Sequence, residues 1–130
     1  MLDTSAYIGL RRGHPLVLDA MAEASNILLP TTVLGELEAG FELAARSAEN
    51  RAALEDFLAE PFVAIRPITR QVAQQYGKLF AALRRAGTPI PLNDVWIAAA
   101  SVVAGARLLT FDHHFERISG LDLRRLKADE

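Results

Sequence analysis

Residues 92–112 read Leu-Asn-Asp-Val-Trp-Ile-Ala-Ala-Ala-Ser-Val-Val-Ala-Gly-Ala-Arg-Leu-Leu-Thr-Phe-Asp. The segment from Leu92 to Ala104 is almost entirely apolar, which predicts a buried helix. Gly105 is a typical helix stop, and residues 107–110, Arg-Leu-Leu-Thr, predict a short strand. A buried helix that leads directly into a strand is typical of α/β proteins with a parallel sheet.

The rest of the chain repeats this alternation of helices and strands. Apolar runs bounded by breaker residues predict strands at residues 2–4, 26–29, 62–65 and, as an edge strand, 121–123. Helical spacing predicts helices at residues 7–12, 16–24, 49–58 and 69–86, a helix capped by Thr31 or Thr32, and a short helix near His114. We therefore expect an α/β fold with a mostly parallel sheet between helices, and one domain spanning residues 1–130.

The composition excludes several classes of protein. The chain has 130 residues, no cysteine and 51% hydrophobic residues, which predicts a globular domain without disulfides or cysteine-bound metals. No apolar run approaches the ~20 residues of a membrane span, and no signal peptide is recognisable, so we expect a cytoplasmic protein. The formal net charge of −2 differs from that of most nucleic-acid-binding domains, which are basic.

Four acidic residues fall where this fold would bring them together. Asp3 and Asp112 follow predicted strands, whereas Glu36 and Asp94 lie in the opening turns of helices. Ligands bind beyond the carboxyl ends of parallel strands, so we expect the four carboxylates to meet at one edge of the sheet. Converging carboxylates persist when a cation neutralises them, and oxygen ligands select Mg²⁺ or Mn²⁺. Two such ions can activate water and stabilise the leaving oxygen of a phosphodiester.

Each acid also has an ordinary structural interpretation. Asp3 and Asp112 can cap the helices that follow them, and Glu36 and Asp94 can complement helix N-termini. Spacing alone therefore leaves both a metal site and four separate structural roles open.

Four short segments resemble the motifs of the PIN-domain family. They are Leu2-Asp3-Thr4-Ser5, Val33-Leu34-Gly35-Glu36-Leu37 followed by Gly40, Asn93-Asp94-Val95-Trp96-Ile97-Ala98-Ala99-Ala100, and Leu108-Leu109-Thr110-Phe111-Asp112-His113-His114-Phe115. Their order and spacing extend over nearly the whole chain, and they resemble in particular the VapC toxins of type II toxin–antitoxin pairs.

The resemblance implies a three-layer α/β/α fold with a five-stranded, mostly parallel sheet. It also implies an Mg²⁺- or Mn²⁺-dependent endoribonuclease that cuts single-stranded RNA. The residues that would form its catalytic metal site are Asp3, Glu36, Asp94 and Asp112. The polar residues that would support them are Thr4, Ser5, Asn93 and Thr110. Family members are typically homodimers, inhibited by a small cognate antitoxin whose tail lies across the active-site groove.

Two features depart from the family pattern. The first strand is unusually short, because Asp3 comes almost at the start of the chain, so either the true start lies upstream or this edge of the site is less well anchored. Asp112 is followed by His113 and His114, and Glu116 is the nearest candidate for a further acid. A zinc site on the two histidines is disfavoured because adjacent side chains diverge and oxygen ligands dominate. One of these histidines can instead approach RNA or metal-bound water.

Arg11, Arg12 and Trp96 are candidates for contacts with RNA. The two arginines lie about two helical turns after the first motif, where they can hold phosphates or simply belong to a solvated helix face. Trp96 can stack on a base, but its apolar neighbours favour packing in the core or in a dimer.

Two other functions remain open. Phosphatases of the haloacid-dehalogenase type also begin with an aspartate at a strand end, but they need a second aspartate two residues on, where this chain has Ser5. A catalytically silent PIN-like module for binding RNA or protein would keep the fold, but the presence of all four acids argues against it.

Overall fold

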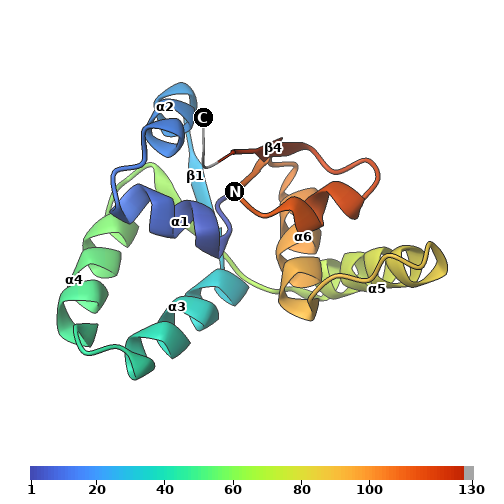
Figure 1. The fold of residues 1–130 in the computed structure, drawn as a ribbon, viewed down its shortest axis with the longest axis horizontal. Helices are drawn as coiled ribbons and strands as arrows, with labels where there is room; N and C mark the ends of the chain where they lie inside the picture. Colours follow the sequence, from blue (N-terminus) through green and yellow to red (C-terminus); the bar gives the residue numbers. More distant parts are fainter. Residues whose placement is uncertain (128–130) are drawn as a thin grey trace.

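Short parallel strands run through the middle of the computed structural model, which describes residues 1–127 (Figure 1). The elements in chain order are α1 (Thr4–Arg11), α2 (Pro15–Glu23), β1 (Ile27–Pro30), α3 (Thr31–Leu43), α4 (Ser47–Leu58), β2 (Val63–Arg66), α5 (Arg70–Arg85), α6 (Leu92–Ala104), β3 (Leu108–Thr110), the 3-10 helix η1 (His113–Arg117) and β4 (Leu123–Arg125). This alternation confirms the predicted α/β class.

The N-terminal residues join two pairs of parallel strands into one surface. β1 pairs with β2, and β3 pairs with β4, both in parallel. Between the pairs, Leu2 forms a parallel bridge with Leu109, and its amide donates to the carbonyl of Leu28. The spatial order is therefore β2, β1, Leu2, β3, β4. Within the described residues, the expected five strands are four strands and one bridging residue.

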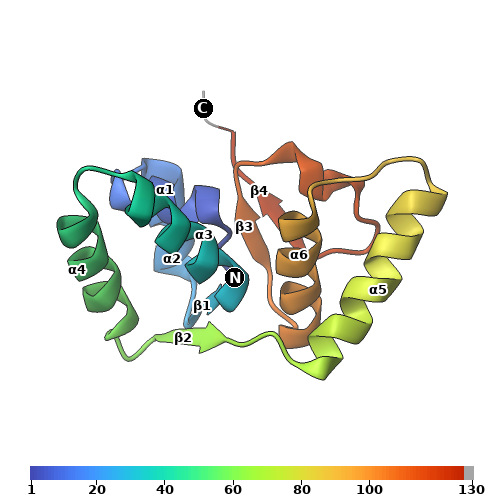
Figure 2. The same ribbon diagram turned by 90° about the horizontal axis from the view of Figure 1, so that it is seen from below.

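Helices pack on the strands and also lie at both ends of the molecule. Figure 2 shows α4 and α5 at opposite ends of the molecule, with the strands between them (Figure 2). α1 packs on β3, α3 on β1, and α4 on β2, whereas α5 packs mainly on α6. This arrangement leaves the start of α1, the start of α6 and the end of β3 near the centre of the molecule.

The apolar helix predicted from the sequence is confirmed as α6. It buries Val95, Ile97 and the alanines at 98–100, and Gly105 ends it in the left-handed conformation that glycine adopts at least cost. The fully buried Leu108 and Thr110 of β3 continue the same core. The segment on which the fold prediction rested therefore lies at the centre of the fold.

Two details of the prediction are wrong. α3 is capped by the backbone of Pro30 without a side-chain hydrogen bond, and Thr32 Oγ1 is buried without a partner among the described residues, so neither threonine caps the helix. The edge strand lies at Leu123–Arg125, two residues later than expected. No helix within residues 1–127 is long and apolar enough to span a membrane.

Candidate metal centre

Asp3 is held rigidly at the junction of the N-terminal bridge and α1. Its side chain is buried, with 4% of the residue exposed. Oδ1 accepts hydrogen bonds from the amide of Ala6 at 2.8 Å and the hydroxyl of Ser5 at 2.7 Å. Oδ2 accepts one from the hydroxyl of Thr110 at 2.5 Å. Asp3 is thus the N-cap of α1, and it also lies at the carboxyl edge of the sheet beside β3.

Burial raises the pKa of Asp3 above its ordinary value. Desolvation is the largest cause, and the hydrogen bonds from Thr110, Ala6 and Ser5 oppose it. The negative charge of Asp112 adds to the increase.

Asp94 lies in the first turn of α6 and reaches the same region. Its side chain is only 15% exposed. Desolvation raises the pKa of Asp94 to about 6, and a hydrogen bond with His114 opposes the shift. The charges of Asp112 and Asp3 push the pKa further upward. Three carboxylates distant in the sequence therefore repel one another at one place.

Asp112 completes this acidic group from the loop after β3. Its Oδ1 caps η1 by accepting from the amide of His114 at 2.9 Å, and its own amide donates to Thr110 Oγ1 at 2.9 Å. Both the capping role and the position beside the other acids are therefore present in one residue. About a third of its side chain, 32%, remains open to solvent.

Glu36 stands beside this group and is connected to it through Thr4. The Thr4 hydroxyl donates to Glu36 Oε1 at 2.9 Å, and Thr4 directly follows Asp3. Glu36 is half-buried in α3 and lies in its second turn, so the helix orients its carboxylate toward the start of α1. A polar hydrogen-bonded link thus joins α3 to the site.

The supporting residues expected from the sequence fall into two groups. Thr4, Ser5 and Thr110 each hydrogen-bond a carboxylate of the site. Asn93 does not: its side chain is exposed and makes no hydrogen bond within the described chain.

The other candidate residues lie at different distances from the acids. Arg11 and Arg12 are exposed at the far end of α1, about 12 Å along the helix from Asp3. Glu116 pairs with Arg125, which lowers the pKa of Glu116, and so it does not supply a further acid to the group. Trp96 stacks on Tyr76 of α5 with ring centroids 3.9 Å apart, which confirms packing between helices as its role.

His114 lies beside the acids. The sequence had left open which of the two adjacent histidines approaches the site. The Nδ1 atom of His114 lies 3.2 Å from Asp94 Oδ2 and 3.1 Å from Asp112 Oδ1. One ligand atom from each of these three residues lies within 4.8 Å of the others. The only signal in the sequence was its place two residues after Asp112, inside the turn that Asp112 caps.

The donor set of this region fits a divalent cation. Carboxylates that are desolvated and repel one another are stabilised when a cation replaces the missing solvation. Carboxylate oxygens are the ligands that Mg²⁺ and Mn²⁺ prefer. The same arrangement does not fit a phosphatase with a second aspartate, because Ser5 hydrogen-bonds Asp3 and the amide of Phe111.

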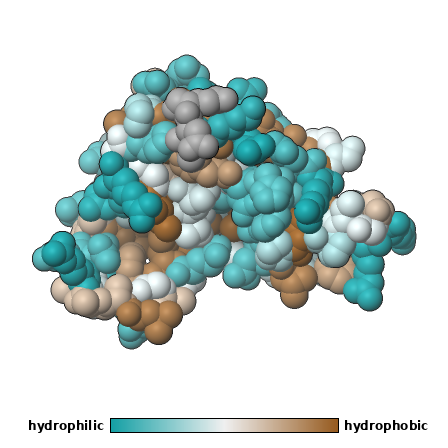
Figure 3. Space-filling view, viewed as in Figure 1, coloured by the Kyte–Doolittle hydropathy of each residue, from teal (hydrophilic) through white to brown (hydrophobic). Residues whose placement is uncertain are grey.

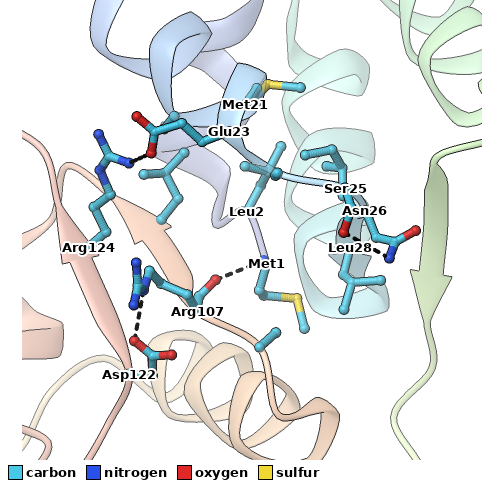
Figure 4. A pocket seen from close by; sticks show the side chains of 15 residues that line it. Met1, Leu2, Met21, Glu23, Ser25, Asn26, Leu28, Arg107, Asp122 and Arg124 are labelled. Carbon is cyan, nitrogen blue, oxygen red and sulfur yellow. Dashed lines mark hydrogen bonds and ion pairs between the residues drawn. The ribbon is translucent and has the colours of Figure 1, made fainter.

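A separate cavity lies at the opposite edge of the sheet. It has a volume of about 480 Å³ and is lined from Met1, the end of α2 and the starts of β1 and β3 (Figure 4). Its charged groups are already paired: Arg107 with Asp122, and Arg124 with Glu23. This cavity lies at the amino ends of the strands, away from the carboxyl edge where α/β proteins bind ligands. The side chains of its described acidic residues are both paired with arginines.

Comparison with known proteins gives one consistent result. The family model of the PIN domain matches residues 1–121. The chain is 32% identical over 130 residues to Ribonuclease VapC4 of Mycobacterium tuberculosis, covering 95% of this chain and 93% of that protein. It is 31% identical over 129 residues to Ribonuclease VapC1 of Haemophilus influenzae, covering 93% of this chain and 92% of the relative.

A solved structure extends the likeness to three dimensions. The structure of VapBC2 from Rickettsia felis, bound to a DNA fragment from its promoter, has a TM-score of 0.84 and 28% sequence identity. The match covers 96% of each chain. A family model over nearly the whole chain, relatives above 30% identity and the same three-dimensional fold agree, and the chain belongs to the PIN-domain family.

Proposed function

We propose that this chain is a cytoplasmic endoribonuclease that hydrolyses phosphodiester bonds of single-stranded RNA with the help of Mg²⁺ or Mn²⁺. The observation that carries the proposal is the convergence of Asp3, Asp94 and Asp112, where burial, together with the charges of Asp112 and Asp3, raises the pKa of Asp94 to about 6. Such mutual repulsion is relieved by a divalent cation at the carboxyl edge of a parallel sheet. The relatives named ribonucleases support the choice of substrate.

The residues of the proposed site have different roles. The ions would be held by Asp3, Asp94 and Asp112. Glu36, which Thr4 orients by a hydrogen bond, would be a further ligand. When bound, divalent ions activate water for attack at phosphorus and neutralise the leaving oxygen. Ser5 and Thr110 fix the carboxylate of Asp3 with short hydrogen bonds, so that its oxygens keep one orientation. No side chain has to become covalently attached to the substrate.

Arg11 and Arg12 are proposed as outlying phosphate contacts. Both are exposed and follow the helix that begins at Asp3. A contact so far from the reacting phosphate would affect substrate affinity more than turnover, and it would weaken as the salt concentration rises.

We further propose that the chain is the toxin of a type II toxin–antitoxin pair and acts as a homodimer with a small cognate antitoxin. The similar structure from Rickettsia felis is a VapBC assembly, which supports a protein partner. Figure 3 shows hydrophobic side chains near the end of α3, where Leu43 is 89% exposed (Figure 3). We propose this end of α3 as one contact for the partner.

The decisive experiment compares carboxylate variants in a purified RNA cleavage assay. Asp3→Asn and Asp94→Asn should each abolish cleavage of a labelled single-stranded RNA in Mg²⁺ or Mn²⁺. Asp19→Asn, on the exposed face of α2, is the matched control and should cleave like the unchanged protein. Full activity in both site variants, or equal activity in EDTA, would remove the proposed nuclease site.

The partner and cellular role need a separate test. Expression of the chain alone should stop bacterial growth, whereas expression of the Asp94→Asn variant should not. Co-expression of the small reading frame beside the gene should restore growth and yield a co-purifying complex. Growth arrest by both forms would separate toxicity from the proposed chemistry.

A further inference from the structure

The imidazole of His114 lies between two carboxylates of the proposed metal site. Its Nδ1 is 3.1 Å from Asp112 Oδ1 and 3.2 Å from Asp94 Oδ2. One ring nitrogen carries at most one proton and so donates one good hydrogen bond, yet two acceptors flank it at nearly equal distances. Only the contact with Asp94 has hydrogen-bond geometry. The position of Nδ1 is therefore not explained by hydrogen bonding alone.

The spacing of these three atoms matches the coordination shell of an ion. Ligands at about 2.1 to 2.2 Å from an octahedral cation, at right angles to each other, lie about 3.0 to 3.1 Å apart. The two measured nitrogen–oxygen separations, 3.1 and 3.2 Å, are close to that edge length. All three donor atoms also lie within 4.8 Å of one another, so a single ion can contact each of them.

We propose that His114 is a metal ligand through Nδ1, together with Asp94 and Asp112, and that it makes this site prefer Mn²⁺ over Mg²⁺. The proposal rests on the proposed function, because it concerns the same metal centre. Mg²⁺ favours an all-oxygen shell and keeps much of its water, whereas imidazole binds later transition metals more strongly. Among divalent ions that carboxylates also accept, Mn²⁺ gains more from a nitrogen ligand than Mg²⁺ does.

The local backbone places His114 for this role and leaves His113 outside it. Asp112 caps η1 by accepting from the amide of His114, which turns that side chain back toward Asp94. His113 is 63% exposed at the side chain, and its Nδ1 lies 3.9 Å from Asp112 Oδ1. His113→Ala is therefore a matched control: it removes an imidazole from the same turn without removing the proposed ligand.

The direct test is pulsed electron paramagnetic resonance of the purified protein loaded with Mn²⁺. A directly bound imidazole nitrogen gives a hyperfine coupling, which changes predictably when the histidines are labelled with ¹⁵N. We expect this coupling in the unchanged protein and in His113→Ala, and its loss in His114→Ala. Because the measurement is decisive in the unchanged protein alone, it does not depend on the variants folding. Absence of the coupling there overturns the proposal.

Calorimetric titration measures the metal preference. His114→Ala should weaken Mn²⁺ binding at least 10-fold and Mg²⁺ binding by less than 3-fold. His113→Ala should change neither affinity. Equal losses for both ions, or no loss, would overturn the proposed selectivity.

The Asp94→Asn variant separates this proposal from the proposed function. If the unchanged protein binds neither ion and Asp94→Asn behaves identically, the metal centre itself fails, and the His114 proposal fails with it. If Asp94→Asn loses both ions but His114→Ala loses neither, only the His114 proposal fails.

Discussion

Thr110, the last residue of β3, donates a hydrogen bond of 2.5 Å to Oδ2 of Asp3, which lies 107 residues earlier in the chain. Its hydroxyl also accepts from the amide of Asp112 at 2.9 Å. Thr110 is completely buried, so its hydroxyl cannot exchange these partners for solvent. One hydroxyl thus connects two acids of the proposed metal centre and fixes their separation.

Thr110→Val should therefore destabilise the protein and weaken metal binding together. The isosteric change leaves Oδ2 of Asp3 and the amide of Asp112 each without the partner they have now, at a cost of about 1 to 3 kcal/mol per buried group. It also removes the hydrogen bond that most lowers the pKa of Asp3, so that pKa rises further and protons compete better with metal. Urea unfolding in EDTA and Mn²⁺ titration at pH 6 and 8 measure the two effects.

Thr110→Ser is the control for this pair of effects. It keeps the hydroxyl and loses only a methyl group, so it should retain metal affinity and lose about 1 kcal/mol of stability. Serine and valine variants with equal metal affinity would show that the hydroxyl does not support the site.

The raised pKa of Asp94 predicts an unusual dependence of stability on pH in the absence of metal. The folded protein holds a proton on Asp94 up to about pH 6, whereas the unfolded chain releases it near its ordinary pKa of 3.8. The folded state therefore binds more protons between these values, and stability falls as pH rises from about 4 to about 6. Part of the site is open to solvent, which screens the charges, so we expect a loss of about 1 kcal/mol.

Asp94→Asn should remove this loss. In EDTA at pH 7.5 the variant should be more stable than the unchanged protein, and the difference should vanish near pH 4. In saturating Mn²⁺ the unchanged protein should be more stable than the variant, because the ion stabilises only the protein that binds it. Chemical unfolding across this pH range is the measurement, and a variant that is less stable at pH 7.5 in EDTA would contradict the origin of the shift.

Most of the fold was predictable because strong local signals mark its elements. Pro15 opens α2, Gly105 ends α6, and the apolar run before Gly105 identifies a buried helix. The predicted position of β4 was two residues too early, because Leu-Arg-Arg has no apolar alternation. Pairing with β3 determines where this strand lies. The first strand is only a bridge because its neighbours Leu28 and Leu109, rather than its own sequence, determine it.

The proposed site was easiest to predict where strand ends determine position. Asp3 and Asp112 follow strand residues, so the parallel sheet brings them to one edge. Asn93 hydrogen-bonds none of them within the described residues: successive helical residues point in directions about 100° apart, and Asp94 is the less exposed of the two. His114 depends on the tight turn of η1, and the sequence contains no pattern that fixes how such a turn aims its side chains.

Gly9→Ala tests how closely α1 packs over the segment that carries Asp112. A Cβ atom at Gly9 would lie 2.9 Å from Phe111 Cε2 and 2.9 Å from Val17 Cγ2, closer than carbon atoms approach. The helix or the Phe111 ring must shift, and we expect a loss of about 1 to 3 kcal/mol in the free energy of unfolding. RNA cleavage should also fall, since Phe111 directly precedes Asp112.

Gly77→Ala is the matched control within a helix. No atom lies within 4 Å of a Cβ built there, so alanine should stabilise α5 by up to about 1 kcal/mol through its higher helix propensity. If both alanine variants stabilise the protein in denaturant unfolding, the packing of α1 against Phe111 is looser than the distances indicate.

Trp96 joins α6 to α5 by stacking on Tyr76, with the ring planes 18° apart. Because it is the only tryptophan in the chain, its fluorescence reports the separation of these two helices. Trp96→Ala should cost about 2 to 3 kcal/mol, since the ring is partly buried and stacked, whereas Trp96→Phe keeps an aromatic surface and should cost about 1 kcal/mol. RNA affinity, measured by anisotropy in the inactive Asp3→Asn background, should be unchanged in Trp96→Phe. A drop of more than 10-fold in RNA affinity, with stability unchanged, would instead assign Trp96 to base stacking.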